Sequence, residues 1–263
     1  MEYFGYFAAI LIGVALGLIG GGGSILTVPV LVYLFGIEPV IATAYSLFIV
    51  GLTSAIGSVD YLHKGLVNIK TAIVFGIPSI LAVFMTRAYI VPAIPNYIFS
   101  ISDFIVTKSI LLMVLFAVLM ISASFSMIKK DKSNIISNTE VTFNYPLILI
   151  EGAIVGSLTG LVGAGGGFLI IPALVILSKL PMKEAIGTSL AIIAAKSLIG
   201  FIGESDETII DWPFLLLISA FAAVGIFIGM AISKKIDGVK LKPAFGWFVM
   251  LMGVYIIVKE LFY

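Results

Sequence analysis

Residues 17–31 read GLIGGGGSILTVPVL, in which four consecutive glycines interrupt an apolar run. Residues 160–175 read GLVGAGGGFLIIPALV and repeat the pattern. A glycine inside a helix costs about 1 kcal/mol relative to alanine, so both clusters are predicted to break a helix. We call residues 20–24 the first break and residues 163–167 the second break. The residues of interest in them are Gly20, Gly21, Gly22, Gly23, Ser24, Gly163, Gly165, Gly166 and Gly167.

The composition predicts that both breaks lie in a membrane protein. Of the 263 residues, 61% are apolar and 11% are charged, whereas a soluble globular domain carries about 25% charged residues. A helix needs about 20 apolar residues to cross a bilayer. Segments near that length lie at 3–19, 39–59, 71–91, 104–128, 145–163, 185–203, 212–233 and 243–262, with shorter apolar pieces at 24–35 and 167–178. We therefore expect an all-α polytopic integral membrane protein.

The two halves of the chain resemble each other. A shift of 143 positions places Gly20 on Gly163 and Pro29 on Pro172, together with further matching glycines. A polar stretch without periodicity separates the halves, as expected of a loop. The sequence predicts a first transmembrane repeat at 1–130, a polar cytoplasmic linker at 131–144 and a second transmembrane repeat at 145–263. Such repeats are common in secondary transporters, which bind substrate near the membrane midplane where the repeats meet.

The basic residues predict how the repeats cross the membrane. If each half crosses the membrane four times, the loops on one side hold six lysines and those on the other side hold eight basic residues. This nearly even distribution favours neither orientation. If the chain turns back at each break, eleven lysines share one side against three basic residues on the other. The positive-inside rule then places the eleven lysines in the cytoplasm and both termini outside. Each half becomes a glycine-broken helical hairpin plus three further transmembrane helices, and the second repeat is inverted.

Several function classes are excluded by composition. The chain has no cysteine and one histidine, so disulfides, thiolate chemistry and a zinc site are not expected. A net charge of +1 offers no footprint for nucleic acid. Neither glycine cluster ends in the Gly-Lys-Ser or Gly-Lys-Thr of a phosphate-binding loop. We expect no catalytic residues, no metal and no cofactor, and a membrane-embedded enzyme is the least favoured class.

The breaks themselves predict an anion site. A helix that restarts after a break offers free N–H groups and about half a positive charge at its first turn, and such ends attract anions. Two of them brought together would make a pocket of positive potential at the midplane. Other glycines lie four residues apart before each break, and for these we prefer the interpretation that they allow close helix packing. They are Gly13, Gly17, Gly152 and Gly156.

A lysine lies inside the apolar stretch SLAIIAAKSLIG. Lys196 costs about 2.5–3.5 kcal/mol at membrane depth on insertion scales, so something must compensate it. In the functional interpretation, Lys196 faces the pocket, where it holds the anion or exchanges a proton. In the structural interpretation, it forms a salt bridge, for example to Glu151, or snorkels to an interface. Arg87, at the end of its helix, is expected to snorkel. Residues 91–103, with two prolines, are expected to lie along the outer surface or to act as a gate.

Hydroxyl side chains follow each hairpin. Thr43 and Ser46 lie after the first hairpin, and Thr188 and Ser189 lie after the second. Their hydroxyls can donate hydrogen bonds to anionic oxygens, although such hydroxyls more often bond a carbonyl of their own helix. A shift of 145 positions places Thr43 on Thr188, and for these two the anion site is the preferred interpretation.

The paired motifs resemble a known family. GLIGGGGSILTVPVL and GLVGAGGGFLIIPALV, followed by IATAYS and AIGTSLA, look like the paired signatures of the sulfite exporter TauE/SafE family, also called the TSUP family. The resemblance covers essentially the whole chain. It implies a polytopic transporter of small, often sulfur-containing anions such as sulfite, sulfonates or thiosulfate. Distant relatives build a thiosulfate route around cysteines in the membrane, and this chain has no cysteine. The chain departs from the family pattern at this point.

The sequence thus predicts a secondary transporter that moves a small anion by alternating access in a prokaryotic plasma membrane. Because no ATPase motif is present, we expect an ion gradient (H+ or Na+), the substrate gradient or another protein to drive it. A passive anion channel with the same pocket is the alternative.

Overall fold

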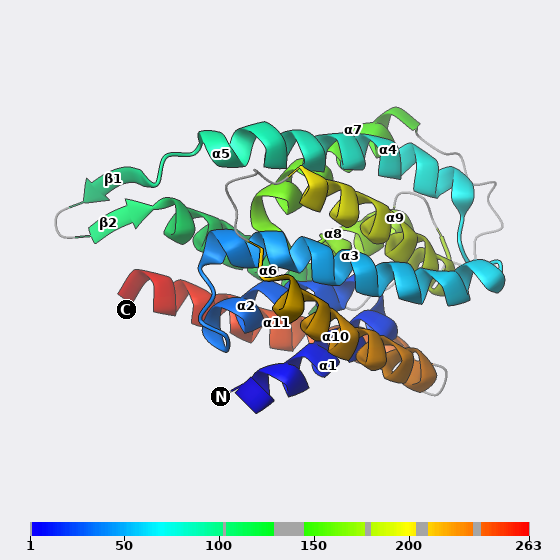
Figure 1. Cartoon of the computed structure of the whole chain (residues 1–263). Coiled ribbons are helices and arrows are strands. Elements are labelled where there is room, and N and C mark those ends of the chain that lie inside the picture. The colour runs from blue at the N-terminus through cyan, green and yellow to red at the C-terminus, as the bar shows by residue number, and fades with distance from the viewer. Residues whose placement is uncertain are drawn as a thin grey trace.

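Helices make up nearly all of the part of the chain that the structure describes, residues 2–101, 104–128, 145–176, 180–203, 210–233 and 238–262 of a computed structural model (Figure 1). The elements of the first half are α1 (Glu2–Ile19), η1 (Gly21–Leu26), α2 (Thr27–Tyr33), α3 (Pro39–His63), α4 (Ile69–Met85), η2 (Thr86–Ile90), α5 (Val91–Ala93), β1 (Tyr97–Ile101), β2 (Phe104–Thr107) and α6 (Lys108–Ile128). Those of the second half are α7 (Tyr145–Val162), α8 (Gly167–Ile176), α9 (Met182–Ile202), α10 (Trp212–Ser233) and α11 (Gly238–Phe262).

Five helices in the described ranges are long and apolar enough to cross a membrane: Pro39–His63, Ile69–Ala93, Lys108–Phe125, Met182–Ile202 and Trp212–Ser233. Three apolar helices are shorter: Phe4–Ile19, Gly23–Tyr33 and Pro146–Val162. Each of them meets a break, because Phe4–Ile19 and Pro146–Val162 end at the glycines and Gly23–Tyr33 begins among them. The architecture confirms the predicted all-α polytopic membrane protein. The linker predicted at 131–144 lies outside the described residues.

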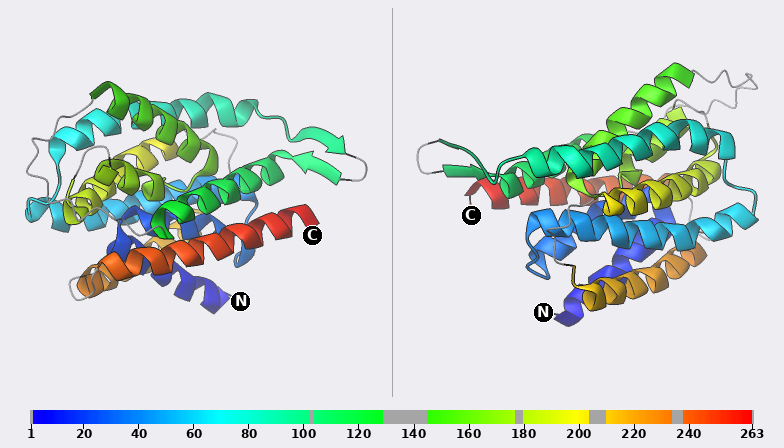
Figure 2. Two further views of the ribbon diagram at one scale, coloured as in Figure 1. Left: turned by 180° about the vertical axis from the view of Figure 1, so that it is seen from behind. Right: turned by 45° about the horizontal axis from the view of Figure 1, so that its top comes forward.

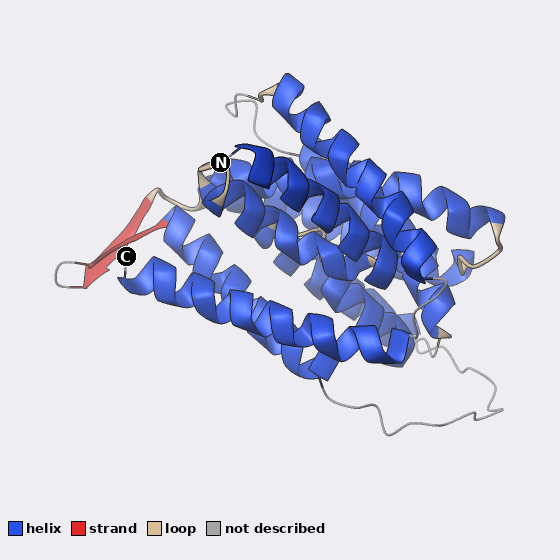
Figure 3. Cartoon of the chain, turned by 90° about the horizontal axis from the view of Figure 1, so that it is seen from below, coloured by secondary structure: helices blue, strands red, loops and turns tan. Residues whose placement is uncertain are grey.

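A small β-hairpin is the exception to the helical fold. Strands β1 and β2 pair antiparallel and project beyond the helices (Figure 3). Residues 104–107 were expected at the start of a helix, but they are aromatic, β-branched and threonine residues that favour strand, and α6 begins only at Lys108. The hairpin and both chain ends lie at the same end of the bundle (Figure 2).

The two halves make equivalent contacts with each other. Helix α1 packs on α10, and α7 packs on α4. A β-carbon at Gly13 would overlap the carbonyl of Ala222, and one at Gly156 would overlap the carbonyl of Ser79. Both glycines and both carbonyls are related by the same shift of 143 positions. These glycines therefore allow close helix packing, as predicted for them.

Helices α3 and α9 pack on each other and are the most buried of the five long helices. Each supports the start of a helix in the opposite half. The Asn68 N–H, at the N-cap of α4, donates to Thr188 Oγ1 over 2.9 Å. The Asp211 N–H, just before α10, donates to the Tyr45 hydroxyl over 2.7 Å. These hydrogen bonds join the two halves around the central helix pair.

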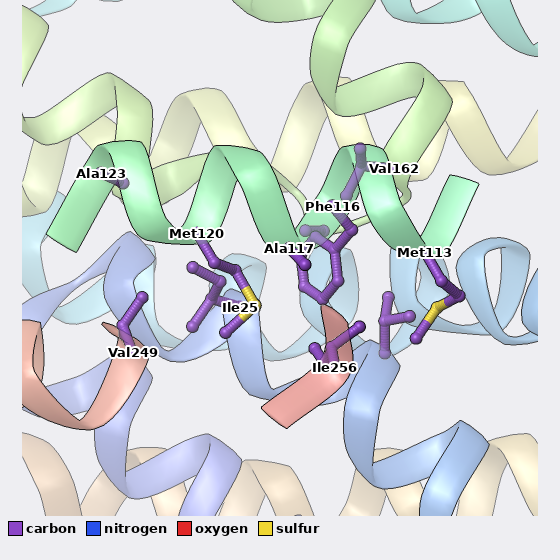
Figure 4. Packing of buried hydrophobic residues seen from close by; sticks show 11 residues of the cluster. Ile25, Met113, Phe116, Ala117, Met120, Ala123, Val162, Val249 and Ile256 are labelled. Atoms are coloured by element: carbon purple, nitrogen blue, oxygen red, sulfur yellow. The ribbon is translucent and has the colours of Figure 1, made fainter. Parts of the chain in front are cut away.

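The last helices of the two halves, α6 and α11, also pack on each other. Met113, Phe116 and Met120 of α6 form an apolar cluster with residues of α11, among them Val249 and Ile256 (Figure 4). Ile25 of η1 belongs to the same cluster and is fully buried. The segment that follows the first break is therefore seated against this helix pair as well as against the central one.

Candidate functional site

The two breaks touch each other inside the bundle. A β-carbon added to Gly21 would overlap the Cα of Gly167, and one added to Gly167 would overlap the Cα of Gly21. The side chain of Ile193, from α9, borders both glycines. The glycine clusters, 143 positions apart in sequence, thus form one junction between the halves.

The first break begins with a backbone conformation that only glycine adopts easily. Gly20 has φ +70°, in the left-handed region that favours glycine. The chain then continues as the 3₁₀-helix Gly21–Leu26, in which the Ser24 hydroxyl donates to the Gly21 carbonyl over 2.7 Å. Helix α2 follows directly, with Leu26 at its N-cap and no side-chain cap. Ser24 is therefore occupied with its own backbone.

The second break has a different backbone. Gly163, Gly165 and Gly166 have φ of +71°, +63° and +68°, so three of its positions favour glycine. No 3₁₀-helix follows it in the described chain, and α8 begins at Gly167. The breaks therefore start alike, at Gly20 and its counterpart Gly163, and then diverge.

Each break packs against the other half of the chain. A β-carbon at Gly163 would overlap Thr43 in α3, and one at Gly20 would lie 3.1 Å from Ile186 and 3.2 Å from Ser189 Oγ in α9. The hydroxyl of Thr43 donates to the Val40 carbonyl over 2.7 Å, and that of Ser189 donates to the Ile186 carbonyl over 2.8 Å. The structure thus brings both residues to the breaks, with their hydroxyls bonded to their own helices.

The other two predicted hydroxyl residues differ from this pair. Thr188 accepts the hydrogen bond from Asn68 described above, so it supports the loop before α4. Ser46 is fully buried, and its oxygen has no hydrogen-bond partner in the described part of the chain. A buried polar atom without a partner is uncommon, and Ser46 shares this state with other buried hydroxyls of the described chain, among them those of Thr53 and Thr71.

Lys196 is fully buried in α9. Its Nζ donates to Thr159 Oγ1 of α7 over 3.0 Å, and a β-carbon at Gly166 would lie 2.8 Å from the same Nζ. In the described ranges the partner that the structure gives Lys196 is Thr159, and it makes no salt bridge to Glu151 there. Burial also excludes snorkelling. Both structural alternatives for Lys196 are therefore wrong, and its ammonium lies against the second break.

Thr159 also lies at the junction, against Lys196 and Gly166, and was not predicted from the sequence. Its hydroxyl donates to the Gly156 carbonyl over 3.1 Å, which turns its lone pairs toward Lys196. It lies four residues before Gly163 and seven before Gly166, a spacing that places all three on one helix face if α7 is extended. Its counterpart in the first half is Leu16. The replacement of an apolar leucine in the first repeat by a polar threonine in the second is the sequence signal that could have identified Thr159.

Arg87 corrects another expectation. It is fully buried within the π-helical turn Thr86–Ile90, so the predicted snorkelling to an interface is wrong. A π-turn widens a helix locally and is often found at functional sites. The turn packs on α7, where a β-carbon at Gly160 would lie 2.8 Å from Thr86 Cβ.

The polar groups at the junction are suited to an anion. Lys196 supplies a cation, and Ser197 follows it with a buried hydroxyl that has no hydrogen-bond partner in the described chain. A β-carbon at Gly165 would lie 3.3 Å from that hydroxyl and would also contact Val50. The junction thus brings the ammonium of Lys196 and the hydroxyl of Ser197 together with apolar neighbours.

Comparison with known proteins gives one consistent result. The model of a family described as sulfite exporter TauE/SafE matches residues 6–256. A probable membrane transporter protein of Xylella fastidiosa is 28% identical over 252 residues, 94% of this chain and 91% of the relative. A probable membrane transporter protein of Bacillus subtilis is 26% identical over 260 residues, 93% of each chain. One of Methanocaldococcus jannaschii is 28% identical over 263 residues, 94% of this chain and 92% of the relative. No solved structure matches the chain significantly.

Proposed function

Because this chain belongs to the sulfite exporter TauE/SafE family, we propose that it carries small sulfur-containing anions across the membrane by alternating access. The family and the apolar helices make it a multi-pass integral membrane transporter and not an enzyme. Sulfite, a sulfonate or thiosulfate is the proposed substrate, bound at the junction of the two breaks.

The observation that carries the proposal is the environment of Lys196. A buried ionisable residue at membrane depth needs compensation, and the hydrogen-bond partner that the structure gives Lys196 is the neutral hydroxyl of Thr159. A substrate anion would supply the missing negative charge. Of the site residues proposed from sequence, Thr43 and Ser189 lie at the breaks, and Ser46 has a buried hydroxyl without a partner among the described residues.

Alternating access would use the contact between the breaks. Gly21 and Gly167 meet backbone to backbone, which leaves no room for an anion between them. In the proposed cycle the two breaks separate to admit the anion and close again on the opposite side. The proposed driving force is a proton or sodium gradient or the gradient of the substrate itself.

Transport by purified protein in liposomes tests this function. We expect saturable uptake of at least one of sulfite, thiosulfate or a sulfonate, with counterflow exchange against unlabelled anion. Sulfate and small carboxylates complete the panel, and imposed H+ and Na+ gradients identify the coupling ion. Ohmic single-channel currents would identify a channel instead, and an absence of both binding and flux for every anion would refute the proposal.

The proposed topology has inverted repeats and both termini outside. Its support is the distribution of lysines and the equivalent contacts that the halves make with each other. The chain contains no cysteine, so single cysteines at Ser133 and Ser205 can be labelled without background. We expect them to react from opposite sides of the membrane. Reaction of both from the same side would exclude this arrangement.

A further inference from the structure

Two hydrogen bonds that join the halves occupy equivalent positions in the duplicated fold. The Asn68 N–H donates to Thr188 Oγ1 over 2.9 Å, and the Asp211 N–H donates to the Tyr45 hydroxyl over 2.7 Å. The shift of 143 positions places Asn68 on Asp211 and Tyr45 on Thr188. The same bond is therefore made twice, each time from the central helix of one half to the start of a helix in the other half.

The two helix starts are also built alike. Asn68 Oδ1 accepts from the Thr71 N–H over 3.0 Å, and Asp211 Oδ1 accepts from the Phe214 N–H over 3.1 Å. Both side chains thus cap their own helix, whereas both main-chain N–H groups are bonded by a hydroxyl of the opposite half. The first N–H groups of a helix find no partner within it, so each of these hydroxyls fastens a helix start to the central helix pair.

The two bonds lie at opposite ends of the central helix pair. Tyr45 is near the start of α3 and Thr188 is near the start of α9, and the two helices run antiparallel (Figure 1). Helix α10 accordingly begins at the end of the bundle that holds both chain ends, and α4 begins at the opposite end (Figures 1 and 2). In a bundle that spans the membrane, the bonds face opposite sides.

The junction of the breaks lies between the two bonds. On α9, Thr188 precedes Ile193, which borders both breaks. On α3, Tyr45 precedes Val50, which borders the second break. Because the two helices are antiparallel, an anion that leaves the junction toward either end passes the level of one of the bonds. Both bonds are formed together with the contact between the breaks, so the junction is closed toward both ends.

Each bond can open without leaving a polar group unpaired. The partners are neutral, and a hydrogen bond of this kind contributes little net free energy because water can replace either partner. Packing supports the closed arrangement at both ends. The rings of Tyr45 and Phe214 lie 6.2 Å apart between centroids, and a β-carbon at Gly187 would overlap the Leu66 carbonyl in the loop before α4. The starts of α10 and α4 are thus held by contacts that are specific but exchangeable.

We propose that these two hydrogen bonds are the latches of the transport cycle. The bond between Asp211 and Tyr45 closes the end that holds the chain ends, and the bond between Asn68 and Thr188 closes the opposite end. The inference rests on the proposed function and adds which contacts open. In each half-cycle one latch breaks, the start of α10 or α4 moves away from the central pair, and the other latch stays formed. Tyr45 and Thr188 are positioning residues in this role and do not contact the anion.

Thiol labelling of the purified full chain tests each latch separately. The chain has no cysteine, and the shift of 143 places Ala42 on Ala185, both fully buried. Ala42 belongs to the same apolar cluster as Leu215 of α10, and Ala185 belongs to the same cluster as Phe75 of α4. Ala42→Cys and Ala185→Cys therefore report opening at the two ends. Their rates of reaction with a small water-soluble thiol reagent are measured without substrate.

The two latch variants should act at different ends. We expect Tyr45→Phe to raise the labelling rate of Ala42→Cys by about two- to tenfold, as for the loss of one neutral hydrogen bond, and to leave that of Ala185→Cys unchanged. Thr188→Val should do the reverse. Thr188→Ser keeps a hydroxyl and should label like the chain with the native threonine.

Matched substitutions elsewhere control for the loss of a hydroxyl. Tyr6→Phe alters another ring that packs on α10, against Phe221, and Thr53→Val alters another buried threonine of the central pair. Neither change should alter the labelling of either cysteine.

Unchanged labelling in both latch variants, or an equal rise at both ends in either variant, would overturn the inference while leaving anion transport intact. A response at one end alone would overturn the assignment of the other latch. Size-exclusion chromatography shows whether each variant is folded, and because the latches are tested independently, a variant that does not fold leaves the other to decide. An absence of binding and flux for every anion in the unmodified chain would instead refute the proposed function.

Discussion

The first and second breaks start from the same backbone conformation and end with different chemistry. Gly20 and Gly163 have nearly equal φ, +70° and +71°. After Gly20 the chain winds into a 3₁₀-helix closed by Ser24, and the positions that the shift of 143 aligns with Thr159 and Lys196 carry Leu16 and Thr53. After Gly163 two more glycines adopt positive φ, and the corresponding neighbours are Thr159 and Lys196. The comparison teaches that the duplicated fold preserves the broken helix in both halves, whereas the polar residues at equivalent positions differ.

Removal of the charge should have the largest effect. Lys196→Met is expected to lower the uptake rate of the anion by about ten- to a hundredfold, because hydrogen bonds to charged groups contribute about 1.5–3 kcal/mol and 1.4 kcal/mol is about tenfold. The unfolding temperature should not fall, since the change removes a buried charge whose partner is neutral.

Thr53→Val is the control for this prediction, because Thr53 is the counterpart of Lys196 in the first half. Its uptake should stay close to that of the unmodified chain. Measurements are initial uptake rates in liposomes and thermal unfolding in detergent. Unchanged uptake kinetics in Lys196→Met would remove Lys196 from the site and with it the contrast between the breaks.

The contact between the breaks should be the next most sensitive feature. Gly21→Ala and Gly167→Ala each place a methyl group against the opposite backbone, and overpacking of this kind costs about 1–3 kcal/mol. We expect both variants to unfold at lower temperature and to transport slowly, because the breaks can no longer close on each other. Gly76→Ala is the control, since its β-carbon would lie 3.9 Å from Ile192 and helix propensity favours alanine. Stability equal to Gly76→Ala in both variants would show that the breaks do not touch.

The packing stripes should respond equally in the two halves. Gly13→Ala and Gly156→Ala introduce equivalent overlaps with the carbonyls of Ala222 and Ser79. Each should lower the free energy of unfolding by about 1–3 kcal/mol, and the two losses should agree within about 1 kcal/mol. A large effect in one variant and none in the other, measured by denaturant or heat, would argue against equivalent packing of the halves.

The smallest expected effect concerns the hydroxyl that closes the first break. Ser24→Ala removes the hydrogen bond to the Gly21 carbonyl and should reduce stability by about 0.5–1.5 kcal/mol with little change in transport. The counterpart of Ser24 is Gly167, which has no side chain, so the second break depends on no such bond. A loss of transport comparable to that of Lys196→Met would instead place Ser24 in the anion site.

Much of the fold was predictable because its signals are local. Apolar runs of membrane-spanning length predicted most of the long helices, and consecutive glycines predicted where α1 ends. The hairpin of β1 and β2 was missed because residues 104–107 are apolar like the helix that follows, and hydropathy alone does not separate the two. Arg87 was misplaced because its position at a helix end suggests access to the interface, whereas its burial depends on other segments.

The sequence by itself determined that the chain is a duplicated membrane protein with two glycine-broken helices and one lysine at membrane depth. These features follow from composition, spacing and glycine's low helix propensity, which act on neighbouring residues. Only the tertiary structure decided that Gly21 meets Gly167, that Thr159 holds Lys196 and that Thr188 supports a loop. Each of these pairs joins residues at least 37 positions apart, and such contacts depend on how whole helices pack.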